Sequence, residues 1–146
     1  MKISTKGRYA LRTMVDLARH VQTAEWIPLR DISHRQEISM KYLEQIVQHL
    51  ASAGLLKSLR GPSGGYQLAR PAVSYTAGEI LRAIEGSLAP VACLENNPNQ
   101  CHRYPICPTV HFYEGLAKVI DEYVDSFTLQ DLADAHEAGE DAVYYI

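Results

Sequence analysis

The three cysteines of the chain, Cys93, Cys101 and Cys107, fall within one short stretch of sequence. Thiolates are soft ligands that suit iron–sulfur clusters or zinc. Zinc sites favour ligand pairs separated by about two to four residues, whereas seven and five residues separate these cysteines. Wide spacing on a loop that can wrap around its ligand favours an iron–sulfur cluster. The alternatives are thiol oxidation to a disulfide or sulfenate, a structural zinc ion, or inert thiols.

The length and composition indicate one globular domain of the cytosol. A chain of 146 residues, 47% of them hydrophobic, buries a core without disulfides or metal staples. No apolar run of about 18 residues is present, and the first ten residues lack an apolar signal core. We therefore expect a cytoplasmic protein with no membrane partner. In the cytosol, cysteines indicate metal binding or redox chemistry more often than structural disulfides.

The charges divide the chain into a basic half and an acidic half. Residues 1–70 carry eleven Lys and Arg against five Asp and Glu, and residues 71–146 carry three against twelve. The overall charge of −3 conceals this division. A basic front half joined to an acidic back half fits a DNA-facing module and a segment that faces away from DNA.

Hydrophobic periodicity predicts three helices ahead of a short hairpin. We expect helices over residues 4–21, 29–36 and 40–53, and strands over residues 56–60 and 66–69. Ser39 can cap the third helix through its hydroxyl. The run Gly61-Pro62-Ser63-Gly64-Gly65 forces a tight turn between the strands. Helix, helix, helix and hairpin is the order of a winged helix-turn-helix, which we expect over residues 1–86.

Further elements follow the expected winged unit. Thr76 can cap a short helix, and a helix over residues 109–127 lies beyond a long loop. Apolar residues on the later helix form one seam suited to a partner helix, namely Tyr113, Leu116, Ile120, Tyr123 and Phe127. We expect a mainly α fold that continues with a cysteine loop, dimerisation helices and an acidic tail, over residues 87–107, 108–135 and 136–146.

The start of the third helix carries the side chains that could read DNA. An α-helix fits the major groove, where base edges present distinct donors and acceptors. The polar residues available there are Ser39, Lys41, Tyr42, Glu44 and Gln45. Lys41 can meet a phosphate or guanine, Gln45 can pair with adenine, and Glu44 can accept from cytosine. Such a face can also be merely solvated, so the inference rests on the whole ordered set of helices and hairpin.

Basic residues outside the third helix extend the expected interface. The expected hairpin is thin and carries Arg60 at its end, with Ser63 and Gly64 in the turn, so it suits the neighbouring minor groove. Lys6 and Arg8 can reach phosphates, which position a protein but do not select sequence. The glycine run is not a phosphate-binding loop, because no Gly-Lys-Ser/Thr follows it. With no catalytic constellation in view, we expect no enzyme.

Several segments resemble the Rrf-two family of bacterial winged helix-turn-helix regulators, whose members include IscR-, NsrR- and CymR-like proteins. The resemblance covers about residues 1–135, and its most specific stretches are YLEQI and RGPSGGY. It implies a homodimer that binds palindromic operators in double-stranded DNA. The recognition helix would be 40–53, the wing 56–69 and the dimer helix 109–127. It also places Ser39, Tyr42, Glu44 and Arg60 among the DNA-contacting positions.

The same resemblance bears on the cysteines. Cluster-binding members carry three cysteines in this loop, which implies a two-iron or four-iron cluster on Cys93, Cys101 and Cys107. IscR-like members add a histidine three residues after the last cysteine, where this chain has Val110. His111 lies one residue further on, and other side chains, a backbone group or a small molecule are alternatives, so the fourth ligand stays open.

The sequence therefore predicts a transcriptional regulator that senses iron–sulfur status, redox state or nitric oxide. We expect the cluster to lie between the DNA-binding unit and the dimer helix. The alternative is a cluster-free, CymR-like regulator controlled by thiol oxidation or by a protein partner.

Overall fold

The computed structural model describes residues 2–135. Three helices open the fold, α1 (Thr5–Arg19), α2 (Leu29–Gln36) and α3 (Met40–Ser52). They are followed by the strands β1 (Leu56–Leu59) and β2 (Gly65–Leu68). This order matches the expected winged helix-turn-helix. The expected acidic tail, 136–146, lies outside the described residues.

Local capping explains where the helices begin. The Ser4 side chain accepts a hydrogen bond from the Gly7 amide at the start of α1. Ser39 accepts in the same way from the Tyr42 amide at the start of α3. Each cap satisfies a backbone donor that has no partner within the helix. The predicted role of Ser39 as a cap is confirmed.

The hairpin is fixed by tight backbone contacts as well as by its turn. Leu56 pairs with Leu68 and Leu59 with Gly65 in an antiparallel register. The segment before α2 joins the hairpin edge, because Ile27 and Tyr66 exchange two backbone hydrogen bonds of 2.9 Å. A Cβ atom at Gly65 would lie 2.2 Å from the Ile27 carbonyl oxygen, so glycine is required at that crossing.

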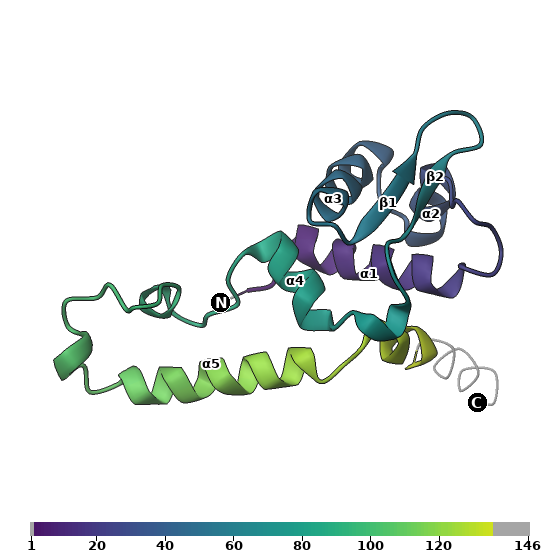
Figure 1. The fold of residues 1–146 in the computed structure, drawn as a ribbon. Coiled ribbons are helices and arrows are strands. Elements are labelled where there is room, and N and C mark those ends of the chain that lie inside the picture. Colours follow the sequence, from purple (N-terminus) through teal and green to yellow (C-terminus); the bar gives the residue numbers. More distant parts are fainter. Residues whose placement is uncertain (1, 136–146) are drawn as a thin grey trace.

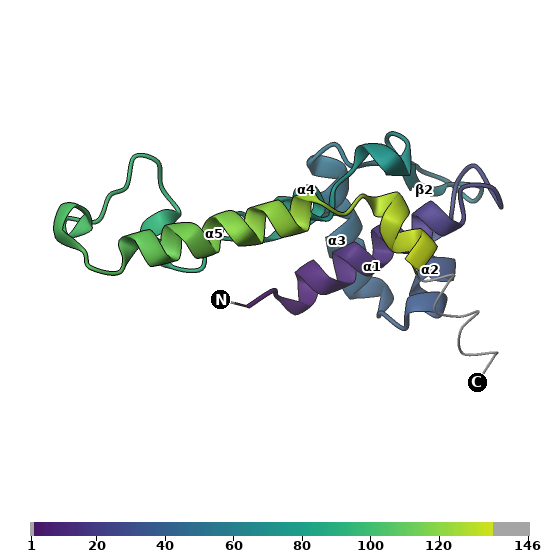
Figure 2. The ribbon, with the colours of Figure 1, turned by 90° about the horizontal axis from the view of Figure 1, so that it is seen from below.

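The second half of the fold begins with η1 (Ala72–Ser74) and α4 (Ala77–Glu85). A long segment containing the short turns η2 (Ala92–Leu94) and η3 (Tyr104–Ile106) leads to α5 (Val110–Asp125). Helix α5 projects away from the winged unit, and the loop before it runs out to the far end of α5 (Figures 1 and 2). The expected cysteine loop, 87–107, therefore runs beside α5 from the end of α4 to the far end of the projection (Figure 1).

One hydrophobic core holds the winged unit together. Helices α1, α3 and α4 supply fully buried side chains such as Met14, Ile46 and Ile80. A last helix, residues 129–135, returns to this core and buries Leu129 and Ala133. These residues fall within the segment expected to hold the dimerisation helices, 108–135, and they pack against the winged unit of their own chain. Among residues 2–135, no helix has both the length and the apolar character of a membrane span.

Candidate nucleic-acid interface and thiol loop

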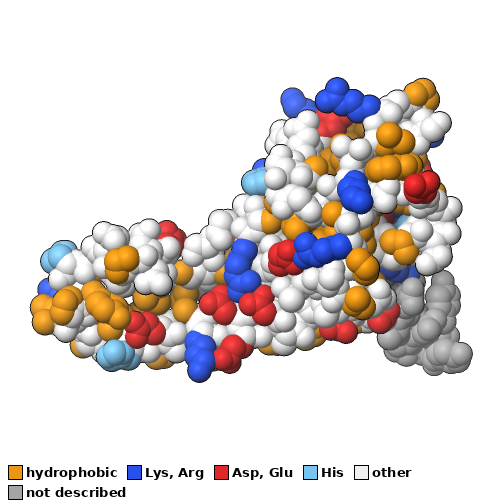
Figure 3. Space-filling view, in the orientation of Figure 1, with side chains coloured by type: hydrophobic (Ala, Val, Ile, Leu, Met, Phe, Trp, Pro, Cys, Tyr) orange, Lys and Arg blue, Asp and Glu red, His pale blue; other side chains and the backbone are white. Residues whose placement is uncertain are grey.

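Helix α3 separates a buried face from a polar face. Leu43, Ile46, Val47 and Leu50 are buried in the core. The polar side chains Lys41, Glu44, Gln45, Gln48 and Ser52 are exposed on the opposite side. Because the core side anchors the helix, the polar side is held at the surface in one orientation. Lys and Arg side chains gather on the end of the molecule that carries α3 and the hairpin (Figure 3).

Tyr42 differs from its polar neighbours because its ring is half-buried. It packs edge-on against the Tyr9 ring of α1, with 5.8 Å between ring centroids. The Arg12 guanidinium lies over the Tyr9 ring, 5.0 Å from its centroid. This aromatic contact fixes the start of α3 against α1, a role that the sequence did not reveal.

The hairpin turn and α3 line a common groove. Its volume is about 760 Å³, and its walls include Arg60 and Gly64 of the turn with Met40 and Gln48 of α3. Arg60 and Ser63 are exposed. The structure thus brings Arg60 and Gly64 beside the predicted recognition helix, whereas Ser63, Lys41, Glu44 and Gln45 are exposed outside this groove.

The basic residues of α1 occupy a separate place. Arg8 is exposed and donates to the Thr5 hydroxyl at 3.1 Å, whereas Lys6 is half-buried. Arg8 lines a second groove, of about 540 Å³, together with Arg12. Lys6 and Arg8 therefore do not share the groove of Arg60.

A buried carboxylate joins the first two helices. Asp16 of α1 accepts from Arg35 at 2.9 and 2.7 Å and from Gln36 at 3.0 Å. The ion pair raises the pKa of the Arg35 guanidinium, mainly through its hydrogen bond to Asp16. Sequence reasoning missed this pair. The one available signal was a lone aspartate on the apolar side of the α1 pattern.

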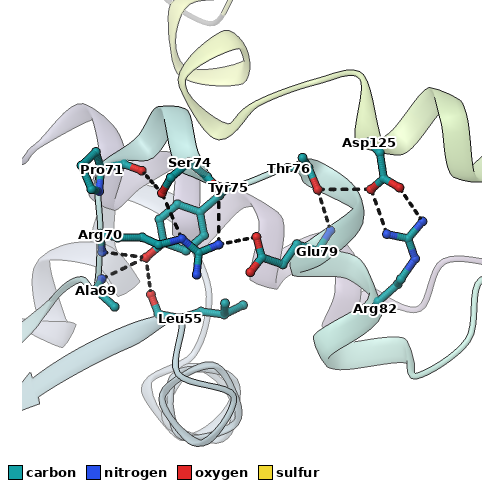
Figure 4. Close-up of polar contacts among 10 residues, drawn as sticks. All are labelled: Leu55, Ala69, Arg70, Pro71, Ser74, Tyr75, Thr76, Glu79, Arg82 and Asp125. Atoms are coloured by element: carbon teal, nitrogen blue, oxygen red, sulfur yellow. Dashed lines mark hydrogen bonds and ion pairs between the residues drawn. The ribbon is translucent and has the colours of Figure 1, made fainter.

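Tyr75 joins the base of the hairpin to the segment before α4. Its ring is fully buried. The hydroxyl donates to the Leu55 carbonyl at 2.7 Å and accepts from the amides of Ala69 and Arg70 at 2.9 and 3.2 Å (Figure 4). The Arg70 guanidinium lies over the ring, 4.1 Å from its centroid.

Ion pairs extend these contacts along α4 to α5 (Figure 4). Arg70 pairs with Glu79 of α4, and this hydrogen bond raises the Arg70 pKa. Arg82, one turn later, donates to both Asp125 oxygens at 2.8 and 3.0 Å and to Asp121 at 2.9 Å. The hydrogen bond from Arg82 lowers the pKa of Asp125 below its ordinary value.

The cysteines lie on the loop as free, half-exposed thiols. Among residues 2–135, no three His, Cys, Asp or Glu side chains come together as a metal site. The donor types suit an iron–sulfur cluster, but this loop conformation does not gather Cys93, Cys101 and Cys107 around one point. A hydrogen bond with the Thr109 hydroxyl, 3.5 Å from Cys107 Sγ, lowers the pKa of the Cys107 thiol.

His111 is exposed to solvent and contacts Glu114. Its side chain is 91% exposed, and Nδ1 lies 3.1 Å from an oxygen of Glu114. The Tyr104 hydroxyl donates to the same carboxylate at 2.8 Å. These two hydrogen bonds lower the pKa of Glu114, with that of Tyr104 the larger. The structure therefore does not place His111 as a fourth ligand.

Helix α5 exposes a stripe of large apolar side chains. Phe112, Val119 and Tyr123 are 68, 61 and 65% exposed, with Leu116 between them. Ile120 of the predicted seam is half-buried and lines a small pocket together with Leu88 of its own chain. The exposed stripe shares Leu116 and Tyr123 with the predicted seam, but Phe112 and Val119 take the places of Tyr113 and Ile120.

Comparisons with known proteins agree with one another. The sequence profile of Rrf2, described as an iron-dependent transcriptional regulator, matches residues 3–135. IscR of Vibrio vulnificus, an HTH-type transcriptional regulator, is 37% identical over 140 residues, which are 96% of this chain and 82% of IscR.

Two solved structures extend the agreement to the fold. CymR, the global cysteine regulator of B. subtilis, matches with a TM-score of 0.75 and 38% identity, covering 92% of this chain and 98% of CymR. IscR of T. potens matches with a TM-score of 0.74 and 40% identity, covering 94% and 90%. The expected mainly helical, winged-helix fold is confirmed. These relatives are regulators of transcription and not enzymes, and the chain belongs with them to the Rrf2 family of transcriptional regulators.

Proposed function

We propose that this regulator reads operator DNA with α3 and the hairpin, as a homodimer in the cytoplasm. The polar residues at the start of α3 would enter the major groove: Ser39, Lys41, Tyr42, Glu44 and Gln45. Arg60, Ser63 and Gly64 would follow the adjacent minor groove. Lys6 and Arg8 would contact phosphates.

The observation that carries this proposal is the shared groove of the wing and the recognition helix. Arg60 of the hairpin and Gln48 of α3 line the same groove. A duplex contacted by the helix would therefore meet the arginine on its neighbouring groove. The buried face of α3 and the Ile27–Tyr66 bridge hold the two parts in a fixed relation.

Selection from a random pool of duplexes tests the proposal. The protein should enrich a two-fold symmetric sequence, and fluorescence anisotropy should show binding that weakens as salt rises. Replacing Glu44 and Gln45 with alanine should reduce discrimination between the enriched and a scrambled duplex. Arg103→Ala, in the exposed loop, is the control. It should leave both the affinity for the enriched duplex and the discrimination against the scrambled duplex unchanged. Failure to enrich any sequence would contradict the proposal.

The exposed stripe of α5 supports a dimer of this chain. Phe112, Leu116, Val119 and Tyr123 offer a helix-long apolar surface that water would otherwise cover. Two such stripes packed together would set two recognition helices on one duplex, as a palindromic site requires.

We propose further that Cys93, Cys101 and Cys107 sense the signal. The thiol chemistry, the position of the loop at the start of α5 and the similarity to IscR support this step. The three thiolates would hold an iron–sulfur cluster after the loop closes, with the fourth ligand undetermined. A bound cluster supplies a centre that oxygen or nitric oxide can alter.

Control by thiol oxidation is the second candidate, and two observations favour it. The loop does not gather three ligands in its described conformation, and the Cys107 pKa is lowered. A lowered pKa increases the thiolate fraction, which is the form that oxidants attack. Control through a protein partner is the other cluster-free alternative.

Anaerobic reconstitution with iron and sulfide separates the candidates. The cluster proposal predicts visible absorption and bound iron that are lost in the Cys93→Ser variant. The oxidation proposal predicts no bound iron, and peroxide-dependent oxidation of Cys107 that mass spectrometry detects. A colourless protein whose thiols also resist peroxide would contradict both.

A further inference from the structure

Tyr75 is bonded to two distant parts of the fold at once. Its hydroxyl holds the base of the hairpin through Leu55, Ala69 and Arg70. Its own carbonyl oxygen accepts from the Leu129 amide at 3.0 Å, just after α5. One buried residue therefore lies between the wing and the segment that follows α5.

The contact between α4 and α5 is equally close. A Cβ atom on Gly78 would lie 2.1 Å from Asp125 Oδ1 and 2.8 Å from Val124 Cγ2. The Ala77 amide donates to the Phe127 carbonyl at 2.9 Å, and the Thr76 hydroxyl donates to Asp125 at 3.2 Å. Helix α5 therefore cannot shift at this point without disturbing the start of α4.

The two ends of this connection differ in stiffness. The ion pairs at the α5 end join Arg82 to Asp121 and Asp125, and these side chains are a third or more exposed. Exposed ion pairs contribute little to stability and can exchange partners with water at low cost. The Tyr75 hydroxyl is buried, and removing it leaves polar groups without partners, which is costly. A displacement of α5 would therefore rearrange the exposed pairs first, and the hairpin base, held by the Tyr75 hydroxyl, would follow the start of α4.

We propose that α4 is the element through which a movement of α5 reaches the wing, with Tyr75 and Arg82 as its two positioning residues. This inference rests on the proposed function and specifies its regulation. A change in the thiol loop, which leads directly into α5, would alter the Arg82 contacts. Helix α4 and Tyr75 would pass the change to Ala69 and Arg70, and so to Arg60 at the end of the hairpin.

Amide hydrogen exchange in the full chain tests the connection without DNA. The Ala69 and Arg70 amides donate to Tyr75, so their exchange rates report the state of the hairpin base. Arg82→Ala should raise both rates by about three- to tenfold, the size expected for a coupled site. Lys118→Ala is the matched control, because Lys118 pairs with Glu122 within α5 at 3.8 Å and does not reach α4.

Operator affinity gives the second readout. Arg82→Ala and Tyr75→Phe should each weaken operator binding. The double variant should lose less binding free energy than the sum of the losses in the two single variants. Gly78→Ala, which forces Asp125 aside without removing a charge, should act in the same direction as Arg82→Ala. The urea midpoint of each variant separates these effects from general destabilisation.

Unchanged amide exchange in both Arg82→Ala and Gly78→Ala would overturn the inference, as would an equal effect of Lys118→Ala. These outcomes are distinct from failure of the proposed function. If the unaltered protein prefers no operator, the DNA-reading proposal fails, while the exchange rates still decide whether α4 connects α5 to the hairpin.

Discussion

Replacing Asp16 with asparagine removes the charge from a carboxylate that joins α1 to α2. Asp16 is 2% exposed. It accepts from the Arg35 guanidinium at 2.9 and 2.7 Å and from Gln36 at 3.0 Å. Asparagine keeps the shape but offers an N–H group where a second acceptor oxygen stood. The helix-turn-helix is therefore expected to lose much of this connection.

The size of the loss follows from burial. A buried hydrogen bond to a charged group contributes about 1.5–3 kcal/mol. The Arg35 side chain is 32% exposed, so water can solvate part of its released charge. We therefore expect Asp16→Asn to lower the free energy of unfolding by about 2–3 kcal/mol in total. For a chain of this length that corresponds to a fall in Tm of about 6–12 °C.

Urea unfolding followed by circular dichroism measures the effect. Arg35→Met should cost more, about 3–5 kcal/mol, because it leaves the buried carboxylate without its cation. Glu122→Gln is the control, since the Glu122 side chain is 66% exposed and lies 3.8 Å from Lys118, away from Asp16 and Arg35 in the sequence. It should change stability by less than about 0.5 kcal/mol. An Asp16→Asn variant as stable as this control would refute the reasoning.

Three further predictions concern the wing, the dimer and the α4–α5 contact. Arg60→Ala should weaken operator binding by about tenfold and reduce discrimination at the flanking bases, as gel shift can measure; unchanged affinity would remove Arg60 from the interface. Val119→Glu should give monomers in sedimentation, because it places a charge in the exposed stripe, whereas Lys118→Glu should not; a dimeric Val119→Glu protein would refute the stripe. Asp125 has a lowered pKa in the folded protein, caused mainly by Arg82. Its ionised form therefore stabilises the fold above its unfolded pKa of about 3.9. The stability difference between the unaltered protein and Asp125→Asn should persist at neutral pH and shrink as pH falls below that value; a difference independent of pH would contradict this assignment.

Local rules were enough for the elements of the winged unit. The Ser39 cap, the apolar spacing of α3 and the glycine-rich turn each act over a few residues. Such signals locate a helix or a hairpin without knowledge of its partners. The expected third helix, 40–53, therefore agrees with α3 to within one residue at its end.

Contacts between distant segments could not be read in the same way. Asp16 looks like an ordinary helix residue until α2 brings Arg35 to it, nineteen residues later. Leu129 and Tyr75 meet only because the chain returns after α5. The spacing of the cysteines likewise could not predict the path of their loop, because that path depends on how α5 projects from the fold. For the same reason the periodic seam included Ile120, although contacts with its own chain partly cover that residue.

The most direct test of the central claim is the ratio of two dissociation constants. Fluorescence anisotropy would compare the symmetric operator with a scrambled duplex of equal length and composition at one physiological salt concentration. Sequence reading by α3 and the hairpin predicts binding to the operator at least about a thousandfold tighter. Equal affinity for the two duplexes would contradict it.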